Sequence, residues 1–346
     1  MTSQVARSKT SAGRFISNRH FLMLGLVVLV LILLVTVVWS IMLGAADISP
    51  QVVLKSIFEF DNSFDHLVIR TVRLPRVVAG VLVGAALAVA GAIMQGLTRN
   101  PLASPGILGI NAGAAFAVVV GVYLLGSPSL SVYAVLAMIG ASITAVIVYG
   151  LGSMGRGGAT PLRLTLAGVV MTSFVGSFTT AILILDQDTL DQIRFWTVGS
   201  LSGRDWALIS QTAPYMLIGL LAGMLLARQI TTISLGEDIA MGLGQSTFVV
   251  KAFSAASVIL LAGGAVALAG PVGFVGLVAP HLARFLAGVD YRWILPYSAL
   301  LGALMVSVGD MAARMVIRPL ELPVGVMMAL IGAPFFIYLA RWKVKS

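Results

Sequence analysis

Cysteine is absent from the chain, histidine occurs three times, and charged residues make up only 10% of the sequence. Without cysteine there can be no disulfide, no thiolate metal site and no cysteine nucleophile. The three histidines, His20, His66 and His281, are isolated in sequence and lack metal-ligand spacing. A soluble domain carries about 25% charged residues, so the scarcity of charge indicates a membrane protein.

Nucleotide-binding and hydrolytic signatures are also missing. There is no GxxxxGK[ST], and no lysine follows a glycine anywhere in the chain, so a phosphate-binding loop is excluded. Neither HExxH nor GxSxG occurs. We therefore expect no catalytic residues, no resident metal and no cofactor bound by this chain, and an intramembrane enzyme would need a catalytic pair that the sequence does not offer.

Long apolar runs fill the chain instead, with 59% hydrophobic residues and a mean hydropathy of +1.02. A membrane span needs about 20 apolar residues, so we predict an all-α polytopic protein. The domains expected are a basic cytoplasmic tail, 1–20, and a ten-helix membrane domain, 21–346. The first run is too long for a signal-peptide core and is interpreted as a retained span. The predicted spans are 21–43, 68–95, 106–125, 130–150, 163–185, 206–228, 247–268, 273–287, 294–316 and 322–340.

The distribution of basic residues sets the expected orientation. With both termini in the cytoplasm, most of the 22 lysines and arginines fall on the cytoplasmic side, as the positive-inside rule requires. The stretch RTVRLPR, 70–76, then lies on the outer face, against the trend. Its arginines, Arg70, Arg73 and Arg76, share one side of a helix because they are three residues apart. They could anchor the helix to lipid headgroups or meet an acidic partner.

A weak internal repeat relates the two halves of the chain. AALAVAG at 85–91 is followed by Pro101, and GAVALAG at 264–270 is followed by Pro280. These copies fall on the second and seventh predicted spans, which run in opposite directions. Inverted repeats of this kind are typical of transporters.

The cytoplasmic segment SLGEDIAMGLG, 234–244, is too apolar for a simple loop. Ser234 followed by Glu237 predicts a capping box that begins a short helix, and Gly242 and Gly244 can end it. Such a helix could rest on the bilayer surface or dock a cytoplasmic partner; we favour docking.

The fifth predicted span carries small residues every four positions: Gly168, Thr172, Gly176 and Thr180. This pattern is typical of close helix packing, but the added hydroxyls also suit the wall of a transport path. Asp310, an acid within the ninth span, lies four residues before Arg314. We expect a local ion pair there rather than a proton-coupling site.

Several segments together resemble the permeases of ATP-binding-cassette (ABC) importers for ferric siderophores, haem and cobalamin, the FecCD-like family. The resemblance covers nearly all of the chain after residue 65. It is carried by RLPRVVAGVLVGAALAVAGAIMQGLTRNPLASPGILG (73–109), WTVGSLSGRDW (196–206), LGEDIAMGLG (235–244), GPVGFVGLVAPHLAR (270–284) and ELPVGVMMALIGAPFFIYLAR (321–341).

The resemblance implies a type II importer permease of ten spans, two such subunits around a central path, two ATPase subunits that carry the ATP and Mg, and a substrate-binding protein docked outside. It implies docking arginines at Arg73, Arg76 and Arg314, to which we add Arg70. It also implies a pathway wall along the fifth span and 188–204. The residues expected to couple to the ATPase are Ser234, Leu235, Gly236, Glu237, Asp238, Ile239, Ala240, Met241, Gly242 and Leu243.

The function expected on this basis is uptake of a ferric siderophore across the bacterial cytoplasmic membrane. Haem and cobalamin remain alternatives within the family, and the sequence leaves homodimer and heterodimer open. An ion-coupled secondary transporter is the alternative of another class, but it would need more intramembrane acids than one aspartate beside an arginine. The first 20 residues have no counterpart in the resemblance.

Overall fold

The computed structural model describes residues 19–44, 48–154 and 160–343, and every regular element in these ranges is helical. The predicted tail, 1–20, falls almost wholly outside the described residues. All ten predicted spans are present as helices, with boundaries shifted by a few residues. They are α1 (Arg19–Met42), α4 (Leu74–Thr98), α5 (Ile110–Leu125), α6 (Leu130–Ser153), α7 (Pro161–Leu185), α9 (Trp206–Leu225), α12 (Thr247–Ala269), α13 (Val275–Ala287), α14 (Tyr291–Met315) and α15 (Val324–Lys343).

Seven helices are long and apolar enough to cross a membrane, and three shorter apolar helices complete the set. The short helices are Ile110–Leu125, Val275–Ala287 and Val324–Ile337. The first two follow irregular segments whose residues Pro105, Leu108 and Val272 are buried inside the bundle. Irregular backbone at membrane depth is tolerated where protein covers it, so these two spans can be shorter than the bilayer.

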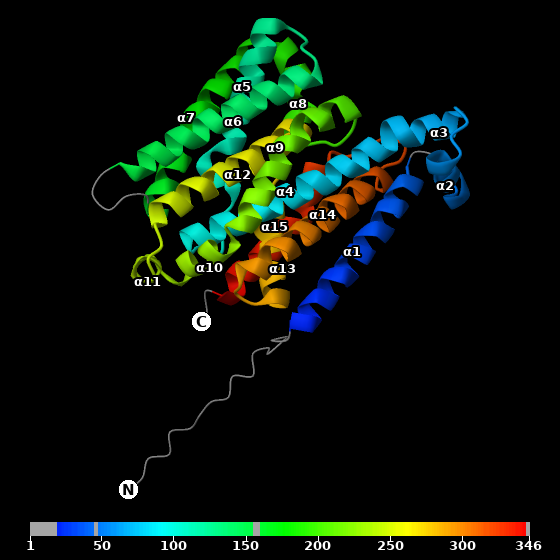
Figure 1. Cartoon of the computed structure of the whole chain (residues 1–346). Helices are drawn as coiled ribbons and strands as arrows, with labels where there is room; N and C mark the ends of the chain where they lie inside the picture. The colour runs from blue at the N-terminus through cyan, green and yellow to red at the C-terminus, as the bar shows by residue number, and fades with distance from the viewer. Residues whose placement is uncertain (1–18, 45–47, 155–159, 344–346) are drawn as a thin grey trace.

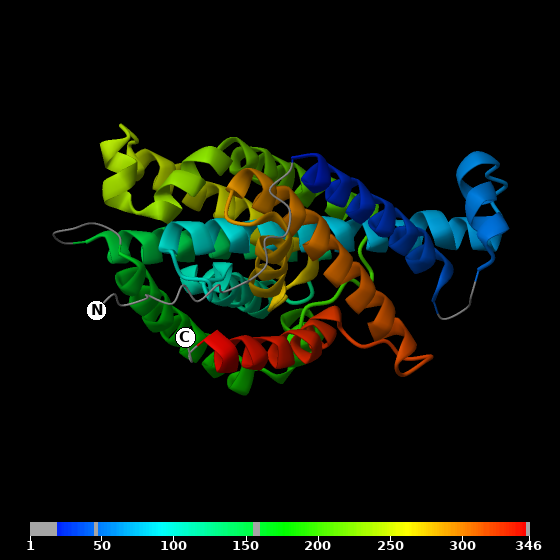
Figure 2. The same cartoon turned by 90° about the horizontal axis from the view of Figure 1, so that it is seen from below.

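Four shorter helices were not predicted as separate elements, and a fifth, α11, is the short helix predicted within 234–244. α2 (Pro50–Phe58) and α3 (Phe64–Val68) precede α4, α8 (Gln187–Thr197) follows α7, and α10 (Ala227–Leu235) and α11 (Glu237–Gly242) connect α9 to α12. Between α3 and α4 the residues Ile69–Arg73 form a π-helical turn, so the helix runs continuously over Phe64–Thr98. Figures 1 and 2 show α2 and α3 projecting beyond the other helices at one end of the bundle. Helix α8 lies toward the same end, which is called the α8 end below (Figure 1). The opposite end carries α11 and is called the α11 end.

The two halves of the chain repeat the same contacts. α5, α6 and α7 pack on one another as α13, α14 and α15 do. α4 packs on α13 and α14, and α12 packs on α5 and α6. Helices α4, α5, α6 and α7 therefore have the counterparts α12, α13, α14 and α15, which is the inverted-repeat architecture expected from the two apolar motifs.

Helix α4 lies at the centre of the bundle (Figure 2). It is buried over most of its length, whereas few residues of α1 and α7 are buried within the single chain. Glycines allow its neighbours to approach: a Cβ on Gly84 or Gly91 would lie closer than 3.0 Å to the backbone of Gly302 or Gly276. Small residues at crossing points are how membrane helices gain packing energy without a hydrophobic driving force.

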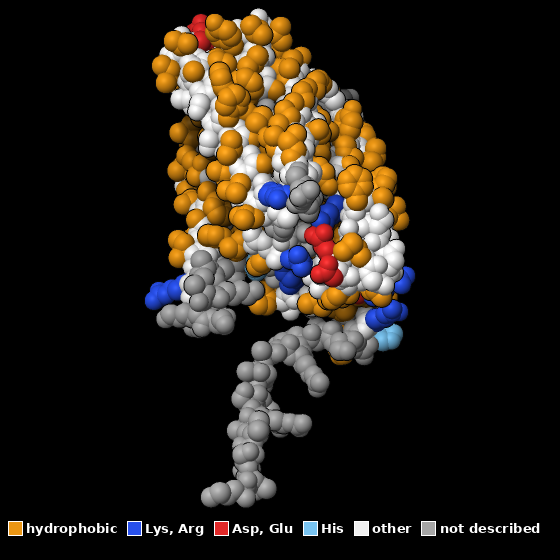
Figure 3. Space-filling model, turned by 90° about the vertical axis from the view of Figure 1, so that its left-hand side faces the viewer, with side chains coloured by type: hydrophobic (Ala, Val, Ile, Leu, Met, Phe, Trp, Pro, Cys, Tyr) orange, Lys and Arg blue, Asp and Glu red, His pale blue; other side chains and the backbone are white. Residues whose placement is uncertain are grey.

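The surface matches a membrane protein. Figure 3 faces the side of α7 and α11 and shows apolar side chains over most of it, with most of the visible lysine, arginine and acidic side chains toward the lower part. Exposed side chains of α7 include Leu166, Val170 and Phe174. Such a face would be unstable in water, so lipid or another subunit must cover it.

Candidate functional sites at the two ends and along α7

The α8 end holds a cluster of buried charges. The Arg76 side chain on α4 donates to Asp310 of α14, with Nη2 2.9 Å from Oδ1, and to Glu321, with Nη1 2.6 Å from Oε2. Arg314 lies one turn beyond Asp310 and its Nε is 3.2 Å from Oδ2. The expected Asp310–Arg314 ion pair is therefore confirmed, with Arg76 as a second cation on the same carboxylate.

Arg73 and Arg314 also donate hydrogen bonds to backbone carbonyls at the end of α1. Arg73 donates from Nη1 to the carbonyl oxygens of Ile41 and Met42, at 2.7 and 2.8 Å. Arg314 donates to the carbonyls of Ser40 and Leu43, at 3.0 and 2.7 Å. Both arginines therefore close the exposed carbonyls at the end of α1, where a helix leaves four C=O groups without helical partners.

The predicted docking arginines are thus not an open surface in this conformation. Arg73 and Arg76 are 8% exposed and Arg314 is 4% exposed. Their burial argues against headgroup anchoring, and their docking role stays a prediction that requires an incoming acid to exchange with an internal partner. Arg70 is more accessible: it donates to the carbonyls of Ser56 and Ile57 and lies 4.0 Å above the ring of Phe60.

The segment 234–244 forms a short helix at the α11 end, but its predicted capping box is wrong. Gly236 separates α10 from α11 with φ of 141°, a value that side-chain-bearing residues rarely adopt. The Ser234 hydroxyl donates to the carbonyl of Thr231 rather than capping α11. The Glu237 carboxylate instead accepts from Lys251 of α12, with Oε1 2.7 Å from Nζ. Glu237 therefore pairs with a lysine of another helix instead of capping its own helix, and only the fold brings these two residues together.

The apolar side chains of this segment face outward. Leu235, Ile239, Met241 and Leu243 are 51–72% exposed, while Ala240 is fully buried against α10 and α12. Gly242 and Asp238 are exposed as well. A fixed helix that presents apolar side chains at a polar end of the bundle is typical of a protein-docking element.

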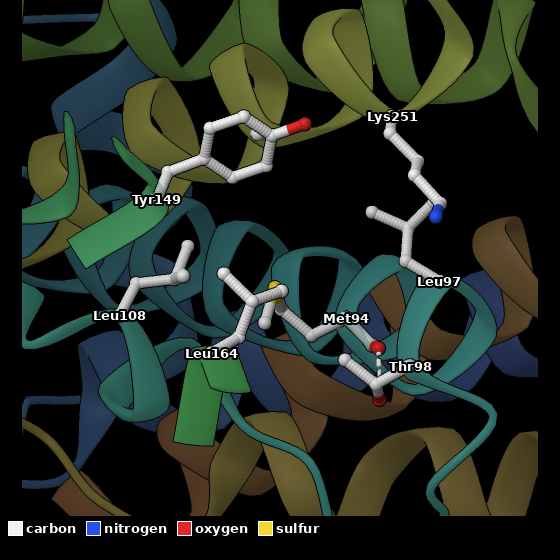
Figure 4. A pocket seen from close by; sticks show the side chains of 8 residues that line it. Met94, Leu97, Thr98, Leu108, Tyr149, Leu164 and Lys251 are labelled. Atoms are coloured by element: carbon white, nitrogen blue, oxygen red, sulfur yellow. Dashed lines mark hydrogen bonds between the residues drawn. The ribbon is translucent and has the colours of Figure 1, made fainter. Parts of the chain in front are cut away.

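Lys251 connects this helix to the interior. It lines a small cavity of about 30 Å³ together with Met94, Leu97, Thr98, Leu108, Tyr149, Leu164 and Ala255. Figure 4 shows its ammonium beside Leu97, with the Tyr149 ring across the cavity and the Thr98 hydroxyl donating to the Met94 carbonyl. The cavity is large enough for one or two waters. The Glu237–Lys251 pair thereby ties α11 to the place where α4, α6, α7 and α12 meet.

The small residues of the α7 stripe have two kinds of surroundings. A Cβ on Gly168 would collide with the carbonyl oxygen of Ile107, so this glycine serves close packing. A Cβ on Gly176 would meet nothing within 4 Å, and Thr172 and Thr180 are exposed. The Thr172–Gly176–Thr180 part of the stripe therefore faces outward from the single chain, where a path wall or a second subunit could use it.

Several partners in these sites were not predicted. Glu321 of the segment before α15 and Lys251 of α12 are separated from Arg76 and Glu237 by other helices or loops, and no local pattern points to them. The Arg284 guanidinium of α13 likewise donates to the Gln95 side chain of α4. Within the described ranges, no group of three His, Asp or Glu side chains is placed to hold a metal ion.

Ten apolar helices with an inverted-repeat arrangement, a short helix with exposed apolar neighbours at one end and a charged cluster at the other are typical of a multi-pass membrane transport protein. Residues 32–342 match the FecCD transport family, and the chain belongs to that family. This assigns almost the entire described structure to one transport domain.

Relatives and a solved structure agree with this assignment. The chain is 46% identical over 320 residues, 92% of this chain and 96% of the relative, to the "Probable siderophore transport system permease protein YfiZ" of Bacillus subtilis (strain 168). It is 40% identical over 318 residues, 92% of this chain and 95% of the relative, to the "Ferric enterobactin transport system permease protein FepD" of Escherichia coli (strain K12). The fold is similar, with a TM-score of 0.80 and 28% identity, to a solved structure described as "An inward-facing conformation of a putative metal-chelate type ABC transporter"; the match covers 93% of this chain and 99% of that one.

Proposed function

We propose that this chain is the membrane permease subunit of an ABC importer that carries a ferric siderophore across the bacterial cytoplasmic membrane. The observation that carries the proposal is the segment 235–243, in which α11 and the residues at its two ends present four exposed apolar side chains, and which is held to α12 by the Glu237–Lys251 pair. Membership of the FecCD transport family and the names of the relatives support the substrate class.

The transport energy comes from a separate chain in this proposal. The sequence has no phosphate-binding loop, so two ATPase subunits bind ATP and Mg and dock on α11 in the cytoplasm. The positive-inside bias places both termini on that side. A helix such as α11 can pass the motion of an ATPase to α12 because it is fastened by an ion pair and by the buried Ala240.

The transport path lies along the exposed stripe of α7 in this proposal, between this chain and a second permease subunit. Thr172, Gly176 and Thr180 offer small, mildly polar groups on a face that is otherwise uncovered in the single chain. A substrate-binding protein docks at the α8 end. Arg70, Arg73, Arg76 and Arg314 gather there, and charge-assisted pairs with its acidic side chains would give orientation.

Ion-coupled secondary transport finds less support. Asp310 is shared between two arginines, Arg76 and Arg314. Both oxygens of this carboxylate are engaged by these arginines, so Asp310 serves the internal network that joins α4 to α14.

The experiment that tests the proposal is uptake of radioactive iron as ferric siderophore, with haem and cobalamin as comparisons, in a strain that lacks this gene and in the restored strain. Uptake of iron chelate that depends on this chain, on an ATPase subunit and on ATP is expected. Uptake that persists without any ATPase, or transport of haem or cobalamin alone, would refute the proposal as stated.

A further inference from the structure

A cavity of about 380 Å³ opens at the α8 end, where the start of α6, helix α8, the loop 198–205 and the segment before α15 meet. Among the residues that line it are Tyr133, Gln192, Trp196, Ser202, Arg204 and Glu321. Its volume is in the range of small-molecule sites, and aromatic walls with a few convergent polar groups are typical of them. Because α8 directly follows α7, the cavity lies at the outer end of the proposed path.

Arg204 is the unusual member of this lining. It is 6% exposed, and its Nε is buried without a hydrogen-bond partner. Among the residues that the structure describes, no ion pair or hydrogen bond satisfies this guanidinium. The buried arginines of the neighbouring cluster, Arg73, Arg76 and Arg314, all have such partners.

The two acids near Arg204 are engaged elsewhere. Asp205 accepts from the backbone N–H of Leu208, at 2.9 Å, and so caps the start of α9. Glu321 is held by Nη1 of Arg76 at 2.6 Å. Burial lowers the pKa of the Arg204 guanidinium to about 10, so the side chain is still a cation at neutral pH. The charge of Asp205 stabilises this cation without a hydrogen bond to it. A buried cation whose N–H donors lack acceptors is costly, and it gains most from an anion that enters the cavity.

We propose that this cavity receives an anionic oxygen group of the ferric chelate, a carboxylate, hydroxamate or catecholate oxygen, and that Arg204 is its charge partner. This inference rests on the proposed function. It adds that the part of the chelate that enters the cavity is negatively charged. The Tyr133 and Trp196 rings meet edge to face, with centroids 6.4 Å apart, and form an aromatic wall for a flat arm. Gln192 and Ser202 line the same cavity and add neutral polar groups to it.

A chelate fits this site better than an acidic side chain of a docked protein. Only 6% of Arg204 reaches solvent, so the occupant must extend well into the cavity. A protein side chain would use the carboxylate alone and leave the aromatic wall unfilled, whereas a chelate arm carries both a planar group and an anionic oxygen.

The test compares Arg204→Gln, Arg204→Lys and the control Arg194→Gln in the complete importer reconstituted in liposomes. Arg194 lies in the last turn of α8, shortly before the loop that carries Arg204, but it is exposed and paired with Asp191. Uptake is measured with ferric enterobactin and ferric citrate, which are anionic, and with ferrioxamine B, which is cationic. We expect Arg204→Gln to raise the KM for the transported anionic chelate about tenfold or more, as loss of one charge-assisted hydrogen bond predicts. Arg204→Lys should keep part of the affinity, and the Arg194 variant should match the parent.

Two further measurements separate a binding role from other roles. The Tm of Arg204→Gln without chelate should be unchanged or raised, because a buried uncompensated cation is removed; a fall of several degrees would make Arg204 structural and overturn the proposal. Affinity for the substrate-free binding protein should also be unchanged, and a loss there would assign the cavity to an acidic side chain of that protein.

Failure of the inference and failure of the proposed function give different results. If the parent importer carries an anionic chelate and Arg204→Gln carries it with the same KM, the cavity is not the receiving site although the function stands. Transport of only cationic or neutral chelates by the parent would also overturn the inference alone. If the parent carries no ferric chelate at all, the proposed function fails and the inference fails with it.

Discussion

The Arg76 guanidinium on α4 grips the Asp310 carboxylate on α14 from two nitrogens, with Nη2 2.9 Å from Oδ1 and Nε 3.0 Å from Oδ2. The two residues are 234 positions apart in the chain. Arg314 shares the same carboxylate, and Glu321 holds the remaining arm of Arg76. Two cations and two anions thus neutralise one another where α4, α14 and the segment before α15 converge.

Removal of the shared carboxylate should be strongly destabilising. Asp310→Ala leaves Arg76 and Arg314 buried without their common partner, and breaking a buried pair costs about 3–5 kcal/mol. Thermal unfolding of the purified protein in detergent measures the effect. Asp191→Ala, which removes the exposed pair with Arg194, is the control and should cost about 1 kcal/mol or less. Equal Tm values for the two variants would show that the buried network contributes no net stability.

Docking of the binding protein can be tested at Glu321, the internal acid that would compete with an acid of that protein for Arg76. Glu321→Gln removes the carboxylate that holds Nη1. If an acid of the binding protein must replace Glu321, this variant should bind that protein several-fold more tightly, because less internal pairing is lost. Surface plasmon resonance on the reconstituted permease gives the Kd. Arg73→Glu should weaken the same interaction, and recovery with arginine at the facing acid would support docking. Unchanged Kd values in both variants would leave Arg73 and Arg76 with a purely structural role.

Coupling to the ATPase should depend on the exposed side chains of α11. Met241→Asp places a charge in the apolar patch and should reduce both ATPase binding and uptake, since an unpaired charge at an interface costs several kcal/mol. The comparison is Met154→Asp, whose side chain is 69% exposed after α6 and does not belong to the patch. Co-purification of the ATPase and substrate-dependent ATP hydrolysis are the measurements. Normal transport by Met241→Asp would exclude α11 as the docking element.

Water access along α7 can be measured directly because the chain has no cysteine. Thr172→Cys and Thr180→Cys should react with a water-soluble thiol reagent in at least one state of the transport cycle. Ala145→Cys on α6 is the control and should stay unreactive, because Ala145 is fully buried. If neither α7 cysteine reacts with nucleotide bound, with nucleotide absent or during turnover, the stripe serves helix packing alone.

Close contacts of α4 should make its glycines intolerant of a single methyl group. Gly91→Ala would place a Cβ closer than 3.0 Å to the backbone of Gly276, and forced overpacking costs about 1–3 kcal/mol. Gly150→Ala on α6 has no atom within 4 Å of the added Cβ. It should be neutral or raise the Tm slightly, because alanine is the better helix former. The Tm of each variant is compared with that of the parent protein, and only Gly91→Ala should lower it. An unchanged Tm for Gly91→Ala would mean that α4 and α13 can separate at little cost.

The sequence by itself determined the architecture. Apolar run length depends only on the thickness of the bilayer and the rise of a helix, so all ten spans could be predicted, including the short one predicted at 273–287 and found at Val275–Ala287. The Asp310–Arg314 pair could also be predicted, because residues four apart are neighbours on any helix. Family motifs such as LGEDIAMGLG located α11, although its internal contacts did not follow from them.

Only the tertiary structure decided which charged residues far apart in the chain meet. Local periodicity does not specify that Arg76 reaches Asp310 and Glu321, that Glu237 turns to Lys251 instead of capping its own helix, or that Arg204 is buried with its neighbouring acids already engaged. It also does not divide the α7 stripe into the packed Gly168 and the open Gly176. These outcomes depend on helix crossings between residues far apart in the chain, and burial there makes each unpaired charge or added methyl group costly.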